Sequence, residues 1–421
     1  MKRKIILAGI ALFMIATNSS AQQWFQVNSG TTKKLNTIDF PSSNVGYIGG
    51  NDSLLLKTTD GGLNWSPVNY SGITYYPGGE HIVNLQFITE NIGFITVGPY
   101  AGSYKTIDGG STWTALTELT TCFNEGLYFF DENNGYIGGS GCFQGEKMNK
   151  LTAGVWSEPT INTFTWNADN RIVDYDFAGT SFGLAASRSG YILRTTDGGT
   201  NWDTIPTPGL IMNPLTSVQI INSNLAYAGY ESINAGFGLY ISTDNGLTWQ
   251  EDMNSATFLY PDFMCLHKSG NGTVFSGGNS SSMSSGAIFD SPGDGTTWNY
   301  SIVDEQINDI SSYNDTIVFA VGDSGYIIVN QDWGTASLDN LALNSVSLEV
   351  YPNPVEDMLN LILDEDLIAA NSRVKVFSIS GELVHSEAFS KQINLDKLKC
   401  GIYFVNVETL HGTITKRIIK H

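Results

Sequence analysis

The fold is decided by one recurring stretch, whose fullest copy reads Thr195-Thr196-Asp197-Gly198-Gly199-Thr200-Asn201-Trp202. Three close copies begin at Thr58, Thr106 and Ser242, and all four fit the pattern Ser/Thr-x-Asp-x-Gly-x-Asn/Thr-Trp. In a tight hairpin, an aspartate can accept hydrogen bonds from the turn's own N–H groups, while glycine supplies a positive φ. The tryptophan provides a large apolar anchor where the next strand begins. The pattern therefore predicts four equivalent hairpins.

The tryptophans that close these stretches mark a regular period along the chain. Successive gaps are 48, 43, 46, 47 and 49 residues between Trp65, Trp113, Trp156, Trp202, Trp249 and Trp298. The pattern has decayed before Trp156 and before Trp298, but the spacing persists. A period of this length is typical of a four-stranded propeller blade.

A second recurring element is a β-rich segment that contains small residues. It occurs seven times, at residues 45–50, 92–98, 134–139, 182–186, 225–229, 273–278 and 316–322. Small residues suit an inner strand, because the blades of a propeller crowd toward its axis. We therefore expect seven blades, with these segments as the inner strands.

The seventh repeat lacks its closing tryptophan, since the expected position holds Ser337. The missing strand has a counterpart at the other end, where residues 24–27 resemble the start of an outer strand. We expect this N-terminal strand to complete the last blade, which would leave the ring without an open edge. A six-bladed or open arrangement is the alternative. The predicted propeller covers residues 22–337.

The first 21 residues have the features of a secretory signal peptide. A basic start, an apolar run from Ile5 to Ala16 and small residues at Ser19 and Ala21 predict cleavage after Ala21. The apolar run is too short to span a bilayer as a helix. We expect no membrane span in the mature chain.

The recurring stretch resembles the Asp-box of BNR-type β-propellers, which include sialidase-like and photosystem II assembly-factor-like proteins. The resemblance lies in the blade motif, so it carries no role in photosynthesis to this chain. It implies an all-β, seven-bladed propeller in which the box aspartates cap turns and take no part in catalysis. These aspartates are Asp60, Asp108, Asp197, Asp244 and Asp332.

The C-terminal segment, residues 346–421, has a different rhythm and follows a linker at residues 338–345. Alternating runs predict the short strands of a small, Ig-like β-sandwich. The Tyr351-Pro352-Asn353-Pro354 start and the Gly401-Ile402-Tyr403 segment with a basic ending resemble the type A C-terminal sorting domain of the Bacteroidota type IX secretion system. That resemblance implies the type IX machinery as a partner. It also implies passage through the periplasm, removal of the tail, and release or attachment at the outer cell surface. A carbohydrate-binding sandwich is the alternative.

Charge and cysteine content limit the partners further. Residues 22–337 contain 10 basic and 30 acidic residues, which argues against nucleic acid and anionic membranes as partners. No Cys/His spacing indicates zinc, and we expect neither metal nor cofactor. In an exported protein, Cys122 and Cys142 favour a disulfide, with two free thiols as the alternative. Cys265 and Cys400 are expected to be unpaired.

Two enzyme classes use related propellers. Sialidases hold a carboxylate with three arginines from separate blades, but Arg171, Arg188 and Arg194 all fall in one repeat here. Lysine replaces arginine poorly at such a site, so this class is disfavoured. A glycoside hydrolase of the xyloglucanase type needs two facing carboxylates. It remains the alternative, although that family uses two propellers, and no catalytic residue is nominated.

A binding module for a glycan or a protein is the favoured interpretation. Loops between repeats are long and rich in aromatic residues, which can stack on a ligand. The alternative is that these side chains only pack the loops. The nominated ligand-binding residues are Tyr75, Tyr76, His81, Tyr100, Trp166, Arg171, Tyr230 and Tyr260.

Overall fold

A computed structural model gives the fold of the chain. It describes residues 24–75, 81–98, 102–121, 123–141, 145–162, 171–208, 213–231, 238–252, 263–279, 285–292, 297–313, 317–331, 348–363, 372–378, 383–409 and 412–421. Contacts divide the chain into two compact units, Met1–Trp333 and Gly334–His421. Within the described ranges, no helix is long and apolar enough to cross a membrane.

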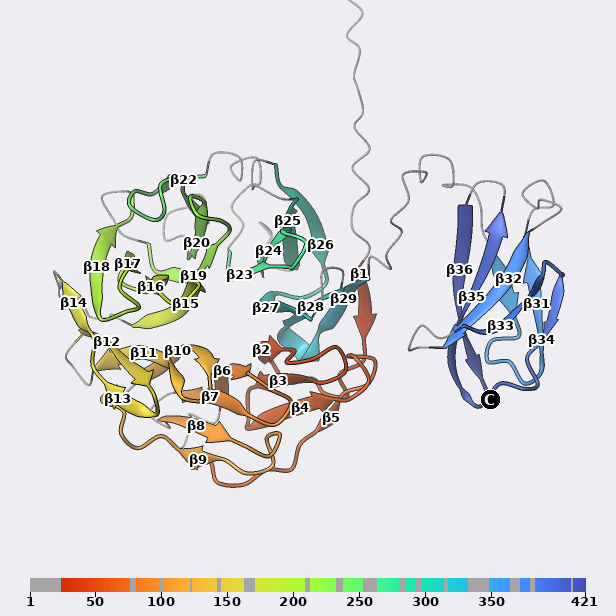
Figure 1. The fold of residues 1–421 in the computed structure, drawn as a ribbon, viewed down its shortest axis with the longest axis horizontal. Helices are drawn as coiled ribbons and strands as arrows, with labels where there is room; N and C mark the ends of the chain where they lie inside the picture. Colours follow the sequence, from red (N-terminus) through yellow and green to blue (C-terminus); the bar gives the residue numbers. More distant parts are fainter. Residues whose placement is uncertain are drawn as a thin grey trace, which may run out of the picture. The chain divides into compact units, whose positions relative to one another are not determined.

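The first unit is a seven-bladed β-propeller, as predicted (Figure 1). Blades 1 and 2 contain β2 (Leu35–Asp39), β3 (Gly46–Gly50), β4 (Leu54–Thr58) and β5 (Ser66–Pro67), then β6 (His81–Phe87), β7 (Gly93–Gly98), β8 (Gly102–Thr106) and β9 (Thr114–Ala115). Blades 3 and 4 contain β10 (Phe123–Asp131), β11 (Asn134–Gly141), β12 (Gly145–Thr152) and β13 (Val155–Ser157), then β14 (Thr160–Asn162), β15 (Ile172–Ala178), β16 (Phe182–Ser187), β17 (Tyr191–Thr195) and β18 (Asn201–Pro206).

The remaining blades complete the ring in chain order. Blades 5 and 6 contain β19 (Leu215–Ile220), β20 (Ala226–Tyr230), β21 (Leu239–Ser242) and β22 (Gln250–Glu251), then β23 (Cys265–Lys268), β24 (Val274–Asn279), β25 (Gly286–Ser291) and β26 (Asn299–Val303). Blade 7 contains β27 (Ile307–Ser312), β28 (Ile317–Gly322), the 3-10 turn η2 (Asp323–Gly325), β29 (Ile327–Gln331) and β1 (Trp24–Val27). Blade 4 has a fifth strand, because β14 pairs in parallel with β18.

Blade 7 joins the two ends of the propeller. Strand β1 pairs antiparallel with β29, with Trp24 opposite Asn330 and Val27 opposite Ile327. Trp24 also packs edge-on against Phe275 of blade 6, at a ring-centroid distance of 6.3 Å. Strand β1 is therefore the outermost strand of blade 7, which lies next to blade 6 in the ring.

The small-residue segments are inner strands of their blades, although the innermost position belongs to another strand. The small-residue segments form the second strand of each blade, and the first strands contact one another around the axis. The second strands need small residues because a side chain from the next blade packs against them. A Cβ on Gly49 would overlap Ile82, and one on Gly277 would overlap Ile307.

The box turns hold their shape through the contacts that their residue types predict. In the fullest copy, Asp197 Oδ1 accepts hydrogen bonds from the backbone N–H groups of Thr200 (2.9 Å) and Asn201 (3.0 Å). Thr195 Oγ1 accepts one from Gly199 N at 2.9 Å, and Gly199 has a φ of 69°. Trp202 is fully buried. The equivalent contacts of Asp60, Asp108 and Asp244 are also present, whereas Asp332 lies outside the described residues.

An Asp197→Ala variant is expected to lower the free energy of unfolding by about 1–2 kcal/mol, because backbone N–H groups lose a charged acceptor. Hydrogen bonding by Asn201 and its neighbours lowers the pKa of Asp197 to about 2. This contribution is therefore present above the unfolded pKa near 4 and is lost as the pH falls toward 2. Chemical denaturation at pH 7 and pH 3 measures both effects. Glu118→Ala, at an exposed carboxylate, is the control; equal losses in the two variants would contradict this role.

Polar side chains connect the first strands at all seven blade junctions. Asp309, Asp39, Gln86, Asp174 and Gln219 each accept a hydrogen bond from a backbone N–H of the next blade. Arg171, just before β15, forms an ion pair with Glu125 of β10. His267 Nε2 and Ser312 Oγ are 2.7 Å apart across the remaining junction. This axial belt links each blade to the next where the strands lie closest.

The carboxylates of the axial belt predict a pH dependence of stability. Burial raises the pKa of Asp39 to about 7 and of Asp174 to about 8. The folded chain binds these protons more tightly than the unfolded chain does. Protonation of the two carboxyls therefore contributes fully to the free energy of unfolding below about pH 4, and this contribution is lost as the pH rises to about 8. We expect a higher melting temperature at pH 5.5 than at pH 8, measured by calorimetry. Asp174→Asn should reduce this slope; an unchanged or steeper slope would contradict the prediction.

The second unit is a small β-sandwich, and its two sheets share one core. One sheet contains β30 (Glu349–Tyr351), β31 (Met358–Ile362) and β34 (Gln392–Asn394); the other contains β32 (Arg373–Ser378), β33 (Leu383–Ala388), β35 (Gly401–Thr409) and β36 (Gly412–Lys420). Leu359 and Ile393 from the first sheet pack with Val376 and Val405 from the second.

The Tyr351–Pro354 segment holds the C-terminal strand. Asn353 Nδ2 donates to Arg417 O at 3.1 Å, and Asn353 Oδ1 accepts from Ile419 N at 2.8 Å. Val355 continues the contact, since its N–H donates to Ile419 O at 2.7 Å and its carbonyl accepts from His421 N at 2.9 Å. Asn353 and Val355 thus connect the first described strands of this unit to its C-terminal strand, β36.

Candidate binding site

The turns of the propeller fall on two opposite faces. Because neighbouring strands within a blade are antiparallel, successive turns alternate between the two edges of each sheet. One face carries the box turns and the turns between first and second strands, and we call it the box face. The other carries the turns between second and third strands and the connections between blades. We call this the loop face, and it includes Asn51–Ser53 and residues 68–75 of blade 1.

The described ligand-binding nominees lie at the loop face. Tyr75 is in the connection between β5 and β6, His81 begins β6, Arg171 directly precedes β15, and Tyr230 ends β20. Tyr75 and His81 flank one junction, between blades 1 and 2, while Arg171 and Tyr230 belong to blades 4 and 5. The other predicted residues lie outside the described residues: Tyr76, Tyr100, Trp166, Tyr260 and the cysteine pair Cys122 and Cys142. Cys265 is free and buried, and Cys400 is free and exposed.

A pocket opens at the blade 1 side of the first junction. Its volume is about 320 Å³, and it is lined by Ser53, Val68, Asn69, Tyr70, Ser71, Ile73 and Tyr75. Val68, Tyr70, Ile73 and Tyr75 also pack against the core shared by blades 1 and 2. The pocket therefore has apolar walls fixed to the core and polar groups at its rim.

Two tyrosine hydroxyls meet at this pocket. Tyr70 Oη donates to Ser53 O at 2.8 Å and lies 2.5 Å from Tyr75 Oη. Burial raises the pKa of both phenols above the ordinary value. Both tyrosines are therefore neutral near pH 7, and each can donate one hydrogen bond and accept others.

The pocket loop is tied to blade 2. Ser71 N donates to Ser111 O at 3.1 Å, and Trp113 N donates to Ser71 O at 2.9 Å. Gly72 has a φ of 93°, and a Cβ there would overlap the Trp113 carbonyl. Tyr104 Oη accepts from Thr74 N and donates to Thr74 O, both at 3.1 Å. These contacts hold Tyr70 and Tyr75 in place without a ligand.

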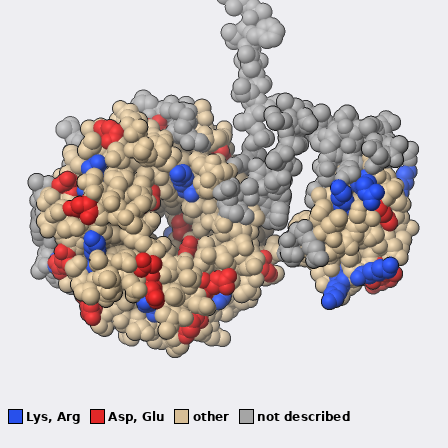
Figure 2. Space-filling view, in the orientation of Figure 1, with Lys and Arg blue, Asp and Glu red and all other residues tan. Residues whose placement is uncertain are grey.

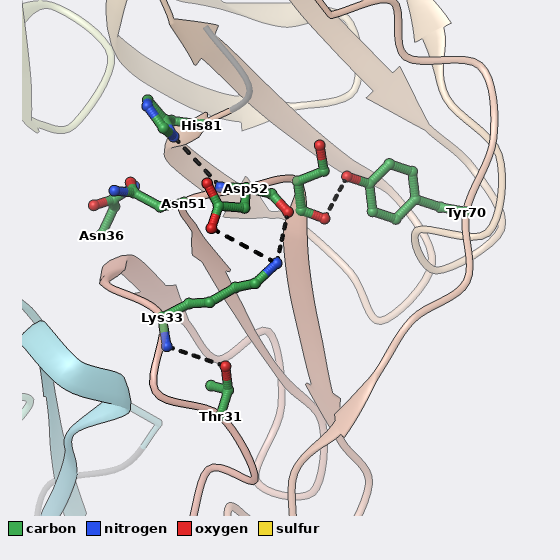
Figure 3. Close-up of polar contacts among 8 residues, drawn as sticks. Thr31, Lys33, Asn36, Asn51, Asp52, Tyr70 and His81 are labelled. Atoms are coloured by element: carbon green, nitrogen blue, oxygen red, sulfur yellow. Dashed lines mark hydrogen bonds and ion pairs between the residues drawn. The ribbon is translucent and has the colours of Figure 1, made fainter. Parts of the chain in front are cut away.

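The opposite rim is the turn between β3 and β4 (Figure 3). Leu54 N donates to Asn51 O at 3.2 Å, and Asp52 and Ser53 have φ values of 52° and 59°. Lys33 Nζ donates to Asp52 O at 3.0 Å and lies 3.9 Å from Asp52 Oδ2. Asp52 N donates to His81 Nδ1 at 3.4 Å. Left-handed backbone at non-glycine residues is uncommon and concentrates at functional sites.

The second group of nominees is held in polar and core contacts. Arg171 pairs with Glu125, and Arg188 Nη2 lies 2.9 Å from Glu231 Oε2. Tyr230 is fully buried and stacks on Tyr240, with ring centroids 4.3 Å apart. Tyr230 was predicted to lie in a ligand-binding loop, whereas the structure makes it a core residue of blade 5.

Several pocket residues were not nominated from the sequence. Ser53 and Asn69 are small polar residues whose types carry no specific signal for a site. Tyr70 was not nominated, and Lys33 and Asp52 were not singled out. The short Asn51-Asp52-Ser53 run between two strands does predict a turn, but no local pattern shows which loop that turn will face.

Charge is mixed over the viewed face of the propeller. Figure 2 shows Lys and Arg interspersed among Asp and Glu on the viewed face, with the ring open at its centre. The view shows no basic stripe of the kind that attracts nucleic acid. Among the described residues, no group of three or more His, Cys, Asp or Glu is placed to hold a metal ion.

Comparisons with known families match two separate parts of the chain. Residues 349–421 match the family described as secretion system C-terminal sorting domain. Residues 16–116 match the family described as photosynthesis system II assembly factor YCF48. The sorting domain indicates export by the type IX system, to the cell surface or the medium, and implies contact with that machinery. No curated protein matches the chain.

Solved structures with the same fold share little sequence with this chain. YCF48 bound to D1 peptide is 17% identical with a TM-score of 0.55, covering 73% of this chain and 96% of that one. YCF48 from Cyanidioschyzon merolae is 17% identical with a TM-score of 0.57, covering 75% and 100%. An ancestral GH74 enzyme is 13% identical with a TM-score of 0.56, covering 95% and 64%. At these identities the likeness concerns the fold.

Proposed function

We propose that this chain works outside the cell as a binding module. The premise is that it contains a BNR (Asp-box) β-propeller similar to YCF48, followed by a secretion-system C-terminal sorting domain. Its ligand is a glycan or a protein, held at the loop face of the propeller. The sorting domain serves export, and the propeller does the binding after export.

One observation carries this proposal: a pocket whose loop is held by hydrogen bonds to blade 2. Its volume of about 320 Å³ is at the low end of the range for small-molecule sites. The hydrogen bonds of Ser71 and Thr74 to blade 2 fix the loop. A site that is already ordered loses little conformational entropy on binding. The solved complex of YCF48 with D1 peptide supports the proposal as an example of a propeller of this fold that binds a polypeptide.

Glycoside hydrolysis is the second candidate, and the likeness to an ancestral GH74 enzyme favours it. Such chemistry needs a pair of carboxylates facing the substrate. The described box aspartates are poor candidates, because their own turns supply hydrogen bonds to their carboxylates. None of the residues that line the pocket is acidic.

The proposal is tested with residues 22–421, the chain without its predicted signal peptide, applied to immobilised polysaccharides and to a peptide library. Saturable binding without release of reducing sugar is the expected result. Release of reducing sugar would replace the binding module with a hydrolase. Saturable binding to neither ligand class would overturn the proposal, provided that the protein gives a cooperative unfolding transition.

A further inference from the structure

We infer that the pocket beside Tyr70 and Tyr75 is a subsite for one uncharged sugar ring of a neutral glycan. The inference rests on the proposed binding function and goes further by naming the ligand class and the residues that recognise it. Nothing in the family matches or the structural neighbours assigns a ligand to these residues.

The lining excludes strongly charged ligands. Its seven residues, from Ser53 to Tyr75, include neither a carboxylate nor a cation. Asp52 in the bordering turn forms an ion pair with Lys33, with Nζ and Oδ2 3.9 Å apart, so the two charges compensate each other. The chain itself carries a net charge of −20, which disfavours uronates and sulfated glycans through long-range repulsion. A cationic ligand would find no carboxylate in the lining to pair with.

The polar groups suit hydroxyls better than a peptide backbone. One common mode of extended-peptide recognition adds the peptide as a strand along a row of free backbone groups at a sheet edge. Here the backbone of Ser71 is already bonded to Ser111 and Trp113. The groups at the rim are side chains: the two phenols, the exposed Asn69 amide and the exposed Ser71 hydroxyl. Asn69 and Ser71 can each donate and accept, while the phenol oxygens, whose hydrogens are engaged with Ser53 O and with each other, can accept from sugar hydroxyls.

The apolar part of the lining matches the other property of a sugar ring. A pyranose has a C–H face as well as a hydroxyl edge, so it needs apolar contact beside polar groups. Val68, Ile73 and the tyrosine rings are half-buried against the core of blades 1 and 2. Aromatic and aliphatic walls with a few convergent polar groups are typical of small-ligand pockets.

The test measures binding of residues 22–421 to neutral oligosaccharides by calorimetry. The probes are xylo-, cello- and manno-oligosaccharides, with oligogalacturonate as the charged counterpart and an uncharged extended peptide as the polypeptide counterpart. Asn69→Ala removes an exposed side chain and leaves the fold intact, and it is expected to weaken neutral binding about tenfold. Tyr75→Phe, which removes one hydroxyl, should weaken it severalfold. Tyr313→Phe is the matched control, because this half-buried tyrosine lies beside Gly61 on the box face.

Binding of a neutral oligosaccharide, weakened by Asn69→Ala and unchanged by Tyr313→Phe, supports the subsite. Neutral binding that is insensitive to both pocket variants would place the site elsewhere and overturn the inference. Binding only of oligogalacturonate or only of the peptide would also overturn it, while the proposed binding function would stand. If the chain binds none of these probes, the subsite is overturned. The polysaccharide and peptide-library screen then decides separately whether the chain binds any ligand.

Discussion

A Trp24→Ala variant is expected to lose about 2–4 kcal/mol of the propeller's free energy of unfolding, less than a fully buried tryptophan would lose. Trp24 lies in the strand that completes blade 7 and packs on Phe275 of blade 6. Removing its ring therefore weakens blade 7 and its junction with blade 6 together. Denaturation followed by tryptophan fluorescence measures this, because all nine tryptophans precede Gly334 and report on the propeller unit.

The neighbouring residue offers a matched control. Phe25 belongs to the same strand but is 44% exposed, so Phe25→Ala is expected to cost less than about 1 kcal/mol. Similar losses in the two variants would show that the strand contributes only through its backbone. A negligible loss in Trp24→Ala would contradict the view that β1 stabilises the closed ring.

Asn353→Ala is expected to loosen the C-terminal strand and to reduce export. Two hydrogen bonds to β36 disappear, so amide exchange in residues 412–421 should accelerate about tenfold or more. Hydrogen–deuterium exchange with mass spectrometry measures the first effect. The fraction of the chain that reaches the medium or the cell surface, compared with the periplasm, measures the second.

Asn394→Ala serves as the comparison for Asn353→Ala. Asn394 is also exposed, and its side chain accepts a bond from Asp396 N within a local turn. It is expected to change neither β36 exchange nor export. Faster exchange with normal export in Asn353→Ala would separate the stability of this strand from recognition by the secretion machinery.

The sequence predicts the repeated parts of this molecule well, because their geometry depends on local chemistry. Each box carries its own hydroxyl, carboxylate, glycine and tryptophan, so the turns at Asp60 and Asp197 could be identified without any distant contact. The sequence did not show which strand of each blade lies at the axis, because the reason for the small residues lies in another blade. Gly49 is required by Ile82, which no pattern within one repeat reveals.

The candidate site was only partly predictable for the same reason. Tyr75 was nominated from an aromatic loop, but the pocket exists because that loop meets the turn at Ser53. Tyr230 looked equivalent in sequence, yet stacking on Tyr240 draws it into the core. The boundaries of the signal peptide, linker and mature propeller, and the Cys122–Cys142 bridge, remain predictions.

The pairing of β1 with β29 also bears on how the ring closes. Trp24 and Asn330 lie at opposite ends of the propeller sequence, so we expect this contact to form late, because it has a long loop to close. Blades 1 to 6 can assemble from contacts between neighbouring repeats, whereas blade 7 waits for both ends. Until then the chain exposes the unpaired edges of β1 and β29, which are the segments most exposed to misassembly during biogenesis.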